Sequence, residues 1–186
     1  MELKEFDYDL PKELIAQEPV MPRDSARLLY LPIREGACRH HTFRDIVEYL
    51  RAGDVLVFNK TRVIPARLLG KKTGTGGQIE CFLLHQETED TWSCLVRPGR
   101  RLQPGTRLEF GDGLLKGLIL SRTEAGGRLV RFEWAGDFQE VLQKIGIVPL
   151  PPYIHKPLAD PERYQTVYGN KPGSVAAPTA GLHFTP

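Results

Sequence analysis

Residues 63–134 are divided into short apolar segments by turns rich in glycine and proline. The segments are residues 64–69, 78–84, 91–96, 106–110, 114–121 and 128–133. Short segments at nearly regular spacing, with turn residues between them, are typical of a small antiparallel β-barrel. We therefore predict such a barrel, in a domain that spans residues 63–148.

One turn of this region, Lys71-Lys72-Thr73-Gly74-Thr75-Gly76-Gly77, has the composition of a phosphate-binding loop. It lacks the order of residues that such a loop requires, and it leads into a strand pattern instead of a helix. The sequence therefore predicts a hairpin turn here.

The residues before the barrel alternate between helix and strand patterns. A short helix is predicted from residue 11 to about 18, a strand at 27–31, and a second helix at 43–50. Thr42 and Asp45 form a capping-box pattern at the start of the second helix, whose apolar residues recur at helical spacing. Such alternation favours an α/β domain.

Residues 54–59 form a nearly continuous apolar run, which favours a strand covered on both faces. Polar residues at the end of such a strand are a common place for a site, so Thr61 and Arg62 are candidates; a solvated turn is the alternative. In the loop before residue 27, Arg23 has two interpretations as well. It binds a phosphate, or it forms an ion pair with the neighbouring Asp24, which is the commoner role.

A further helix follows the barrel strands. Asp137 and Glu140 begin it with a second capping-box pattern, and Gly146 ends it. The proline-rich residues 148–154 then predict an extended connector.

The connector fits a return of the chain from the barrel to the first domain. We therefore expect an α/β main domain, made of residues 1–62 and 149–186, with the barrel inserted in it.

Basic residues occur in two clusters, although the formal net charge of the 186 residues is only +2. The first cluster is Lys60, Arg62, Arg67, Lys71 and Lys72, and the second is Arg97, Arg100, Arg101 and Arg107. Clusters of this kind on a small barrel fit a phosphodiester backbone. A solvated basic face is the alternative.

The composition is globular, with 41% hydrophobic and 26% charged residues. The three cysteines are an odd set without CxxC spacing, which argues against a disulfide framework and a zinc site. No apolar signal core or membrane-spanning run is found, so we expect a cytoplasmic protein without a membrane partner.

Two segments near the end of the chain carry site-forming residues. Residues 173–186 are dense in Gly, Ala, Ser and Thr, and His183 is their only side chain that titrates near neutral pH. Residues 160–169 combine two tyrosines with Arg163 and Gln165, which suits stacking on bases and bonding to base edges. A flexible tail and half-buried strand tyrosines are the respective alternatives.

The chain resembles the S-adenosylmethionine:tRNA ribosyltransferase-isomerase family of queuosine biosynthesis along its whole length. The resemblance rests on ordered blocks: Phe6-Asp7-Tyr8-Asp9-Leu10-Pro11, Leu14-Ile15-Ala16-Gln17, Arg23-Asp24, residues 53–59, residues 61–68, Pro149-Leu150-Pro151-Pro152-Tyr153-Ile154, Asp160, residues 163–168 and residues 176–185. Lys60 stands where the family has Asp, and Lys156 near a usual Arg. The family's pattern continues beyond Phe184, so the main domain is expected to be incomplete.

The resemblance implies an enzyme that uses S-adenosylmethionine as co-substrate, without a metal, and tRNA as partner. It would transfer and isomerise the ribosyl moiety to 7-aminomethyl-7-deazaguanine at the wobble position, giving epoxyqueuosine, adenine and methionine. A non-catalytic RNA-binding or scaffold fragment is the alternative.

The resemblance also implies residue roles. His183 is the catalytic acid/base candidate, a purely structural donor being the alternative. The expected S-adenosylmethionine-binding residues are Ala177, Pro178, Thr179, Ala180, Gly181, Arg62 and Thr61. The expected substrate-binding residues are Tyr164, Gln165 and Thr166 in the pocket and Arg97, Arg100 and Arg101 on the barrel.

Overall fold

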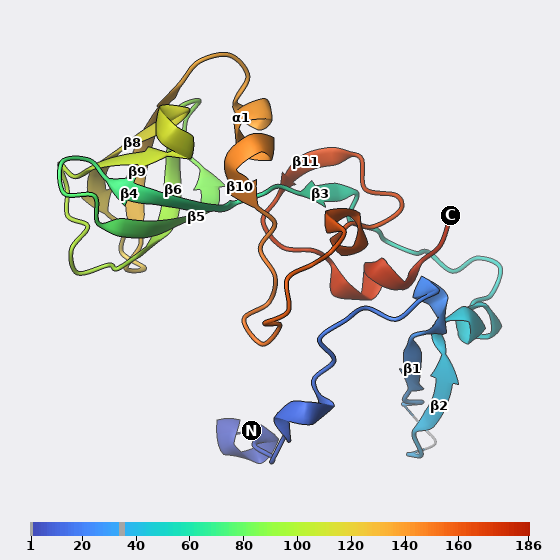
Figure 1. The fold of residues 1–186 in the computed structure, drawn as a ribbon. Coiled ribbons are helices and arrows are strands. Elements are labelled where there is room, and N and C mark those ends of the chain that lie inside the picture. Colours follow the sequence, from blue (N-terminus) through green and yellow to red (C-terminus); the bar gives the residue numbers. More distant parts are fainter. Residues whose placement is uncertain (1, 34–35) are drawn as a thin grey trace. The chain divides into compact units, whose positions relative to one another are not determined.

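The structure is a computed structural model that describes residues 2–33 and 36–186, and it divides into two compact units (Figure 1). One unit consists of Lys60–Pro149 and Gly169–Ala177 and holds the barrel. The other consists of Met1–Asn59, Leu150–Tyr168 and Pro178–Pro186.

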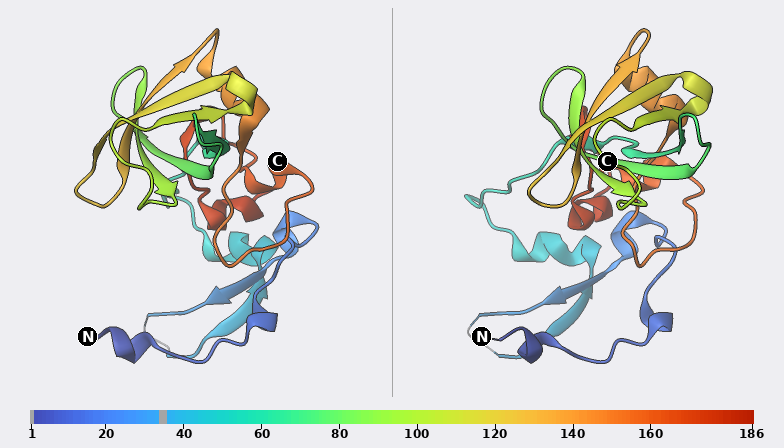
Figure 2. Two further views of the ribbon diagram at one scale, coloured as in Figure 1. Left: turned by 60° about the vertical axis from the view of Figure 1, so that its left-hand side comes forward. Right: turned by 90° about the vertical axis from the view of Figure 1, so that its left-hand side faces the viewer.

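The predicted antiparallel barrel is confirmed. Its strands are β4 (Arg67–Lys72), β5 (Gln78–Gln86), β6 (Thr91–Arg97), β7 (Arg107–Phe110), β8 (Leu115–Arg122) and β9 (Arg128–Trp134). They are ordered β4-β5-β6-β9-β8-β7, and an additional β4–β7 pairing closes the sheet on itself (Figure 2). The short strand β10 (Gly146–Ile147) pairs with the other end of β4.

A glycine makes the closure of the barrel possible. Gly70 of β4 lies opposite Ile79 of β5 and also opposite Phe110 of β7. A Cβ atom at Gly70 would lie 2.4 Å from the carbonyl oxygen of Glu109 and 2.4 Å from a ring carbon of Phe110. Only a residue without a side chain lets the two strands approach this closely.

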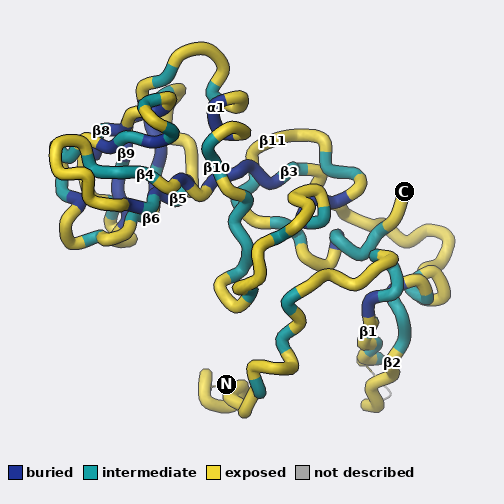
Figure 3. Tube along the Cα trace, viewed as in Figure 1, coloured by how far each residue is buried: buried dark blue, intermediate teal, exposed yellow. Residues whose placement is uncertain are grey.

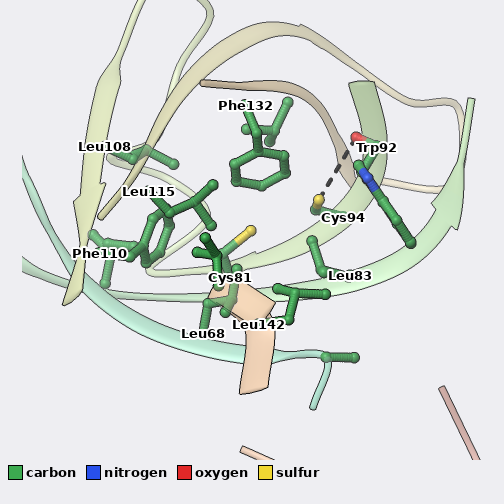
Figure 4. Packing of buried hydrophobic residues seen from close by; sticks show 14 of the residues in the cluster. Leu68, Cys81, Leu83, Trp92, Cys94, Leu108, Phe110, Leu115, Phe132 and Leu142 are labelled. Carbon is green, nitrogen blue, oxygen red and sulfur yellow. Dashed lines mark hydrogen bonds between the residues drawn. The ribbon is translucent and has the colours of Figure 1, made fainter. Parts of the chain in front are cut away.

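Alternating residues of the strands fill the barrel. Buried residues alternate with half-buried or exposed ones over the first five or six residues of β5 and β8 (Figure 3), as the two-residue period of a strand requires. The buried side chains form one apolar cluster that includes Leu68, Leu83, Phe110 and Phe132 (Figure 4). This cluster is the core of the barrel unit.

The predicted helix after the barrel strands is confirmed as α1 (Phe138–Ile145). A carboxylate oxygen of Asp137 accepts a hydrogen bond from the Glu140 backbone nitrogen at 2.9 Å, which satisfies one of the free N–H groups of the first turn. Val141 and Leu142 are buried against the barrel core.

The three cysteines of the chain are free thiols, Cys81 and Cys94 in the core and Cys38 exposed. A hydrogen bond with Cys81, together with burial, raises the pKa of the Cys94 thiol.

The barrel unit also contains a parallel pair of short strands. β3 (Thr61–Val63) pairs with β11 (Lys171–Ser174), and the Ile64 backbone nitrogen donates to the Ser174 carbonyl at 2.8 Å. Val175 packs against the barrel core. The predicted turn at residues 71–77 is confirmed as the hairpin between β4 and β5, where the Lys72 nitrogen donates to the Gly77 carbonyl. A short 3₁₀-helix, η5 (Gly111–Gly113), joins β7 to β8.

The other unit has short elements. Its strands β1 (Arg27–Tyr30) and β2 (Arg39–Thr42) form an antiparallel pair, so the strand predicted at 27–31 is confirmed. Its helices are the 3₁₀-helices η1 (Leu3–Phe6), η2 (Lys12–Leu14), η3 (Arg23–Ser25), η4 (Phe43–Tyr49), η6 (Pro161–Tyr164) and η7 (Thr179–His183). The expected α/β organisation is not confirmed, because the described part of this unit has no α-helix and no parallel strands.

The buried strand predicted at residues 54–59 is wrong. None of the described residues pairs with this run as a strand, and Val55 and Val57 are 85% and 92% exposed. A strand needs a neighbour to take up its backbone hydrogen bonds, and apolar composition alone does not supply one.

The helix predicted at 11–18 is shorter than expected, with helical structure only in η2. The Gln17 side chain donates to the Tyr153 carbonyl at 3.0 Å and accepts from the His155 nitrogen at 2.8 Å, so it holds residues of another segment. The proline-rich connector contains a turn, since the Ile154 nitrogen donates to the Pro151 carbonyl at 3.0 Å. It is therefore not extended throughout.

The helix predicted at 43–50 begins where expected but is the 3₁₀-helix η4. An oxygen of Asp45 accepts from both the backbone nitrogen and the hydroxyl of Thr42 at 2.8 Å. None of the helices in the described ranges is long and apolar enough to cross a bilayer.

Candidate functional site

The residues predicted to form a site are divided between the two units. The barrel unit holds Thr61, Arg62, Ala177, Arg97, Arg100 and Arg101. The other unit holds Tyr164, Gln165, Thr166, Pro178, Thr179, Ala180, Gly181 and His183. Within each unit, the structure shows which of these residues lie together.

In the unit without the barrel, Arg23 connects residues 160–169 (the tyrosine segment) to the end of residues 173–186 (the small-residue segment). Its Nη1 donates to the carbonyls of Gln165 and Leu182 at 2.9 and 3.0 Å, and its Nη2 donates to the Glu162 carbonyl at 2.9 Å. Burial, followed by the charge of Arg163, lowers the pKa of Arg23.

The expected pairing of Arg23 with Asp24 is wrong, because its guanidinium lies among backbone carbonyls. Asp24 instead lies 3.7 Å from a guanidinium nitrogen of Arg44. The carbonyls that Arg23 binds belong to η6, the residue after it and η7, all distant in sequence, and no local pattern indicates them.

Gly181 packs closely against Tyr168 and Thr166. A Cβ atom at position 181 would lie 2.2 Å from the Tyr168 hydroxyl and 3.1 Å from the Thr166 methyl group. The hydroxyl of Thr166 is buried without a hydrogen-bond partner among the described residues. The structure therefore brings together Gly181 and Thr166, two of the predicted residues, and leaves a polar atom there able to bond a ligand.

His183 borders a group of aromatic rings. Its ring centroid lies 5.4 Å from that of Phe43, which also packs edge-on to Phe184 at 4.9 Å. Phe58 contacts both Phe184 and Tyr168, at 5.1 and 5.0 Å. The imidazole is half-buried beside this apolar group. An imidazole in such a place suits either proton transfer or packing, so its catalytic role stays a prediction.

Thr61 and Arg62 are half-buried on β3. The parallel pairing with β11 places Arg62 opposite Pro172. The hydroxyl of Ser174 donates to the Ala176 carbonyl at 2.6 Å, which fixes the start of the small-residue segment.

The three arginines of the second basic cluster surround the Pro98-Gly99 turn. Arg97 ends β6, and the Arg101 nitrogen donates to the Pro98 carbonyl at 3.2 Å. Arg97, Arg100 and Arg101 are exposed, and none of them forms an ion pair with another described residue.

The first basic cluster differs, because the barrel sheet places acids beside it. Arg67 pairs with Glu80 at 2.7 Å, and Lys71 pairs with Glu109 at 3.2 Å. The second cluster is therefore the better candidate for a polyanion.

Arg128, the first residue of β9, is a further residue of this region that the sequence pattern does not indicate. Its side chain is buried, and it donates hydrogen bonds to carbonyls of the loop that carries Arg100 and Arg101. In the sequence, Arg128 follows two glycines at the start of a strand pattern, as an ordinary surface charge would. Residue type and spacing therefore do not indicate that its side chain is buried.

Two further observations concern other kinds of site. A surface depression on the barrel is lined by Thr88, Glu89, Asp90, Phe132, Glu133 and Trp134, which include none of the predicted residues. Within the described ranges, no group of three or more His, Cys, Asp or Glu side chains is arranged to hold a metal ion.

The comparisons with known proteins cover nearly the whole chain. The family model described as "Queuosine biosynthesis protein" matches residues 3–186. A protein of Symbiobacterium thermophilum named S-adenosylmethionine:tRNA ribosyltransferase-isomerase is 56% identical over 185 residues, covering 100% of this chain and 54% of that protein. One of the same name from Acetivibrio thermocellus is 58% identical with the same coverage. The chain thus spans about half the length of these relatives.

A crystal structure of S-adenosylmethionine tRNA ribosyltransferase from Thermotoga maritima is 44% identical in sequence. The match covers 76% of this chain and 48% of that one, with a TM-score of 0.39. The family match and the two curated relatives confirm the resemblance found in the ordered sequence blocks: the chain belongs to the queuosine biosynthesis protein family.

Proposed function

We propose that the chain is an S-adenosylmethionine-dependent tRNA ribosyltransferase-isomerase. It transfers the ribosyl moiety of S-adenosylmethionine to 7-aminomethyl-7-deazaguanine at the tRNA wobble position and isomerises it, giving epoxyqueuosine, adenine and methionine. The observation that carries this proposal is the family match over residues 3–186. Because its tRNA substrate is cytoplasmic, we propose the same location for the protein.

The chemistry defines what the protein must supply. A sulfonium makes the adjacent C5′ protons more acidic, so a positioned base removes one of them, and hydrogen-bond donors stabilise adenine as it leaves. The aminomethyl group of the substrate is mostly protonated in water and loses its proton before it attacks. The wobble base lies in a loop and turns outward without melting a duplex.

We assign the proton-transfer role to His183. The nucleoside end of S-adenosylmethionine would lie along the family-motif residues Ala177, Pro178, Thr179, Ala180 and Gly181, a segment without bulky side chains. The unpartnered Thr166 hydroxyl beside Gly181 supports this placement.

The other residues of the family motifs have complementary roles in the proposal. Tyr164 and Gln165 line the substrate pocket with Thr166. Thr61 and Arg62 hold the ribose or the carboxylate of S-adenosylmethionine. These residues belong to the sequence motifs that carry the resemblance to the family.

The tRNA would bind through Arg97, Arg100 and Arg101 of the barrel. Their exposure and their lack of ion pairs with other described residues favour a contact with the phosphate backbone. We propose that residues 63–148 form the inserted domain that carries this contact, between the segments 1–62 and 149–186 of the main domain.

The test is to incubate the chain with S-adenosylmethionine and an anticodon stem-loop carrying 7-aminomethyl-7-deazaguanine, and to measure adenine release by chromatography. A stem-loop with unmodified guanine is the matched control, and the full-length Symbiobacterium relative is the positive control. Adenine release with the modified RNA alone supports the proposal. Salt-dependent RNA binding without adenine release would favour a non-catalytic RNA-binding module. Absence of both RNA binding and adenine release would favour a scaffold.

A further inference from the structure

The loop between β6 and β7 is held by a buried arginine. Arg128 is 5% exposed, and its Nε donates to the Leu102 carbonyl at 2.7 Å. Its Nη2 donates to the Gly99 carbonyl at 2.6 Å, while Nη1 donates to the carbonyls of Gly126 and Gly127 at 3.1 and 2.8 Å. One guanidinium therefore connects the loop that carries Arg100 and Arg101 to the turn between β8 and β9.

The charge of Arg128 has no acidic partner within the described ranges. The hydrogen bonds that its guanidinium donates go to four backbone carbonyls. Burying a charge is costly, and dipoles of carbonyl groups offset the cost without cancelling the charge. The positive charge under the loop therefore adds to the field of the exposed arginines and attracts an anion.

A fourth exposed arginine is attached to the same loop. Arg122, the last residue of β8, lies opposite Arg128 in the β8–β9 register. Its Nη2 donates to the Gln103 side-chain oxygen at 2.5 Å, and the Gln103 amide donates to the Arg100 carbonyl at 2.7 Å. Glu124, in the following turn, is exposed and forms no ion pair with these arginines in the described part of the chain.

We propose that Arg97, Arg100, Arg101 and Arg122 form one RNA-binding surface, the arginine face, in which Arg122 is a further phosphate-binding residue and Arg128 is a positioning residue. This inference rests on the proposed function, because it takes tRNA as the ligand. Arg128 acts through the loop: its hydrogen bonds fix the backbone from which Arg100 and Arg101 project. Arg122 reaches the same phosphates from β8, with Gln103 orienting its guanidinium.

The experiment measures binding of a fluorescein-labelled anticodon stem-loop RNA to the 186-residue chain by fluorescence anisotropy, over a series of salt concentrations. Arg122→Gln removes one exposed charge, and Lys116→Gln, at the opposite end of β8, is the matched control. We expect Arg122→Gln to weaken binding roughly threefold or more and to lower the salt slope by about 1. Lys116→Gln leaves both unchanged.

Arg128→Lys tests the positioning role, because it keeps the charge but loses the planar fork of donors. We expect it to weaken binding in the wild-type background and to add little in an Arg100→Ala/Arg101→Ala background, since its effect passes through those two residues. A general structural defect would weaken both backgrounds equally. If Arg128→Lys fails to fold, Gln103→Ala tests the other hydrogen-bonded connection to this loop, from Arg122 through Gln103 to the Arg100 carbonyl. Unchanged RNA binding by Gln103→Ala would then contradict positioning of the loop by its hydrogen bonds.

The outcomes separate the two proposals. Salt-dependent binding by the wild-type chain, with Arg122→Gln and Arg128→Lys both indistinguishable from Lys116→Gln, overturns the arginine face and leaves tRNA binding intact. Absence of salt-dependent binding by the wild-type chain overturns the proposed RNA role of the barrel itself, and the arginine face with it.

Discussion

Replacing Gly70 by alanine should open the seam of the barrel. An alanine Cβ would lie 2.4 Å from the Glu109 carbonyl oxygen and 2.4 Å from the Phe110 ring, whereas ordinary contact begins near 3.4 Å. Each neighbour would therefore have to move by about 1 Å. Neither moves easily, because the oxygen belongs to the backbone of β7 and Phe110 is 1% exposed in the core.

The expected cost follows from this geometry. Overpacking a core costs about 1–3 kcal/mol, and two rigid neighbours place Gly70→Ala near the upper value, at about 3 kcal/mol. For a chain of this length, each kcal/mol shifts the unfolding midpoint by about 2–4 °C, so we expect a decrease of roughly 6–12 °C. The assay is thermal unfolding followed by circular dichroism.

Gly77→Ala is the matched control for this measurement. Gly77 lies in the hairpin after β4, and the atom nearest to a new Cβ there is the Thr75 hydroxyl oxygen at 3.7 Å, an ordinary contact. We expect a change within about 0.5 kcal/mol. If Gly70→Ala unfolds at the same temperature as Gly77→Ala, the explanation of barrel closure is wrong.

Three further predictions concern the other unit. Gly181→Ala should destabilise it by about 1–3 kcal/mol through contact with the Tyr168 hydroxyl, and Tyr168→Phe in the same chain should recover most of the loss in a thermal melt; no recovery would contradict the assigned contact. His183→Ala, made in a full-length form, should lower turnover about 10²- to 10⁴-fold with little change in S-adenosylmethionine affinity, and near-normal turnover would leave this residue a packing role. Hydrogen bonds from the Thr42 backbone and then its hydroxyl lower the pKa of Asp45 below its usual 3.8. The stability that Asp45 contributes is therefore present above pH 3.8 and is lost as the pH falls below it, through the lower folded-state pKa; urea unfolding of Asp45→Asn should lack this decrease, and an identical pH profile would refute the cap's contribution.

The barrel could be predicted because its information is local. Each strand carries its own alternation, and each turn carries its own glycine or proline, so the segments at 78–84 and 91–96 agree with β5 and β6 within about two residues. The closing pair is less visible, since Gly70 looks like any other strand glycine until β7 lies beside it.

The rest of the fold depends on partners that a sequence pattern does not name. The apolar run at 54–59 has the composition of a buried strand, yet none of the described strands forms a β-ladder with it. Arg23 and Arg128 have the appearance of surface charges, but both bind backbone carbonyls of residues distant in the sequence. Their roles follow from the folded backbone and are not visible in residue type or spacing.

In the proposed function, the chain attaches the ribosyl moiety of S-adenosylmethionine to a tRNA base. Mass spectrometry of the modified stem-loop RNA after incubation measures this directly. We expect the RNA to gain the mass of the transferred group, with adenine released in equal molar amount. An RNA of unchanged mass, under conditions in which the Symbiobacterium relative converts the same RNA completely, would contradict the claim.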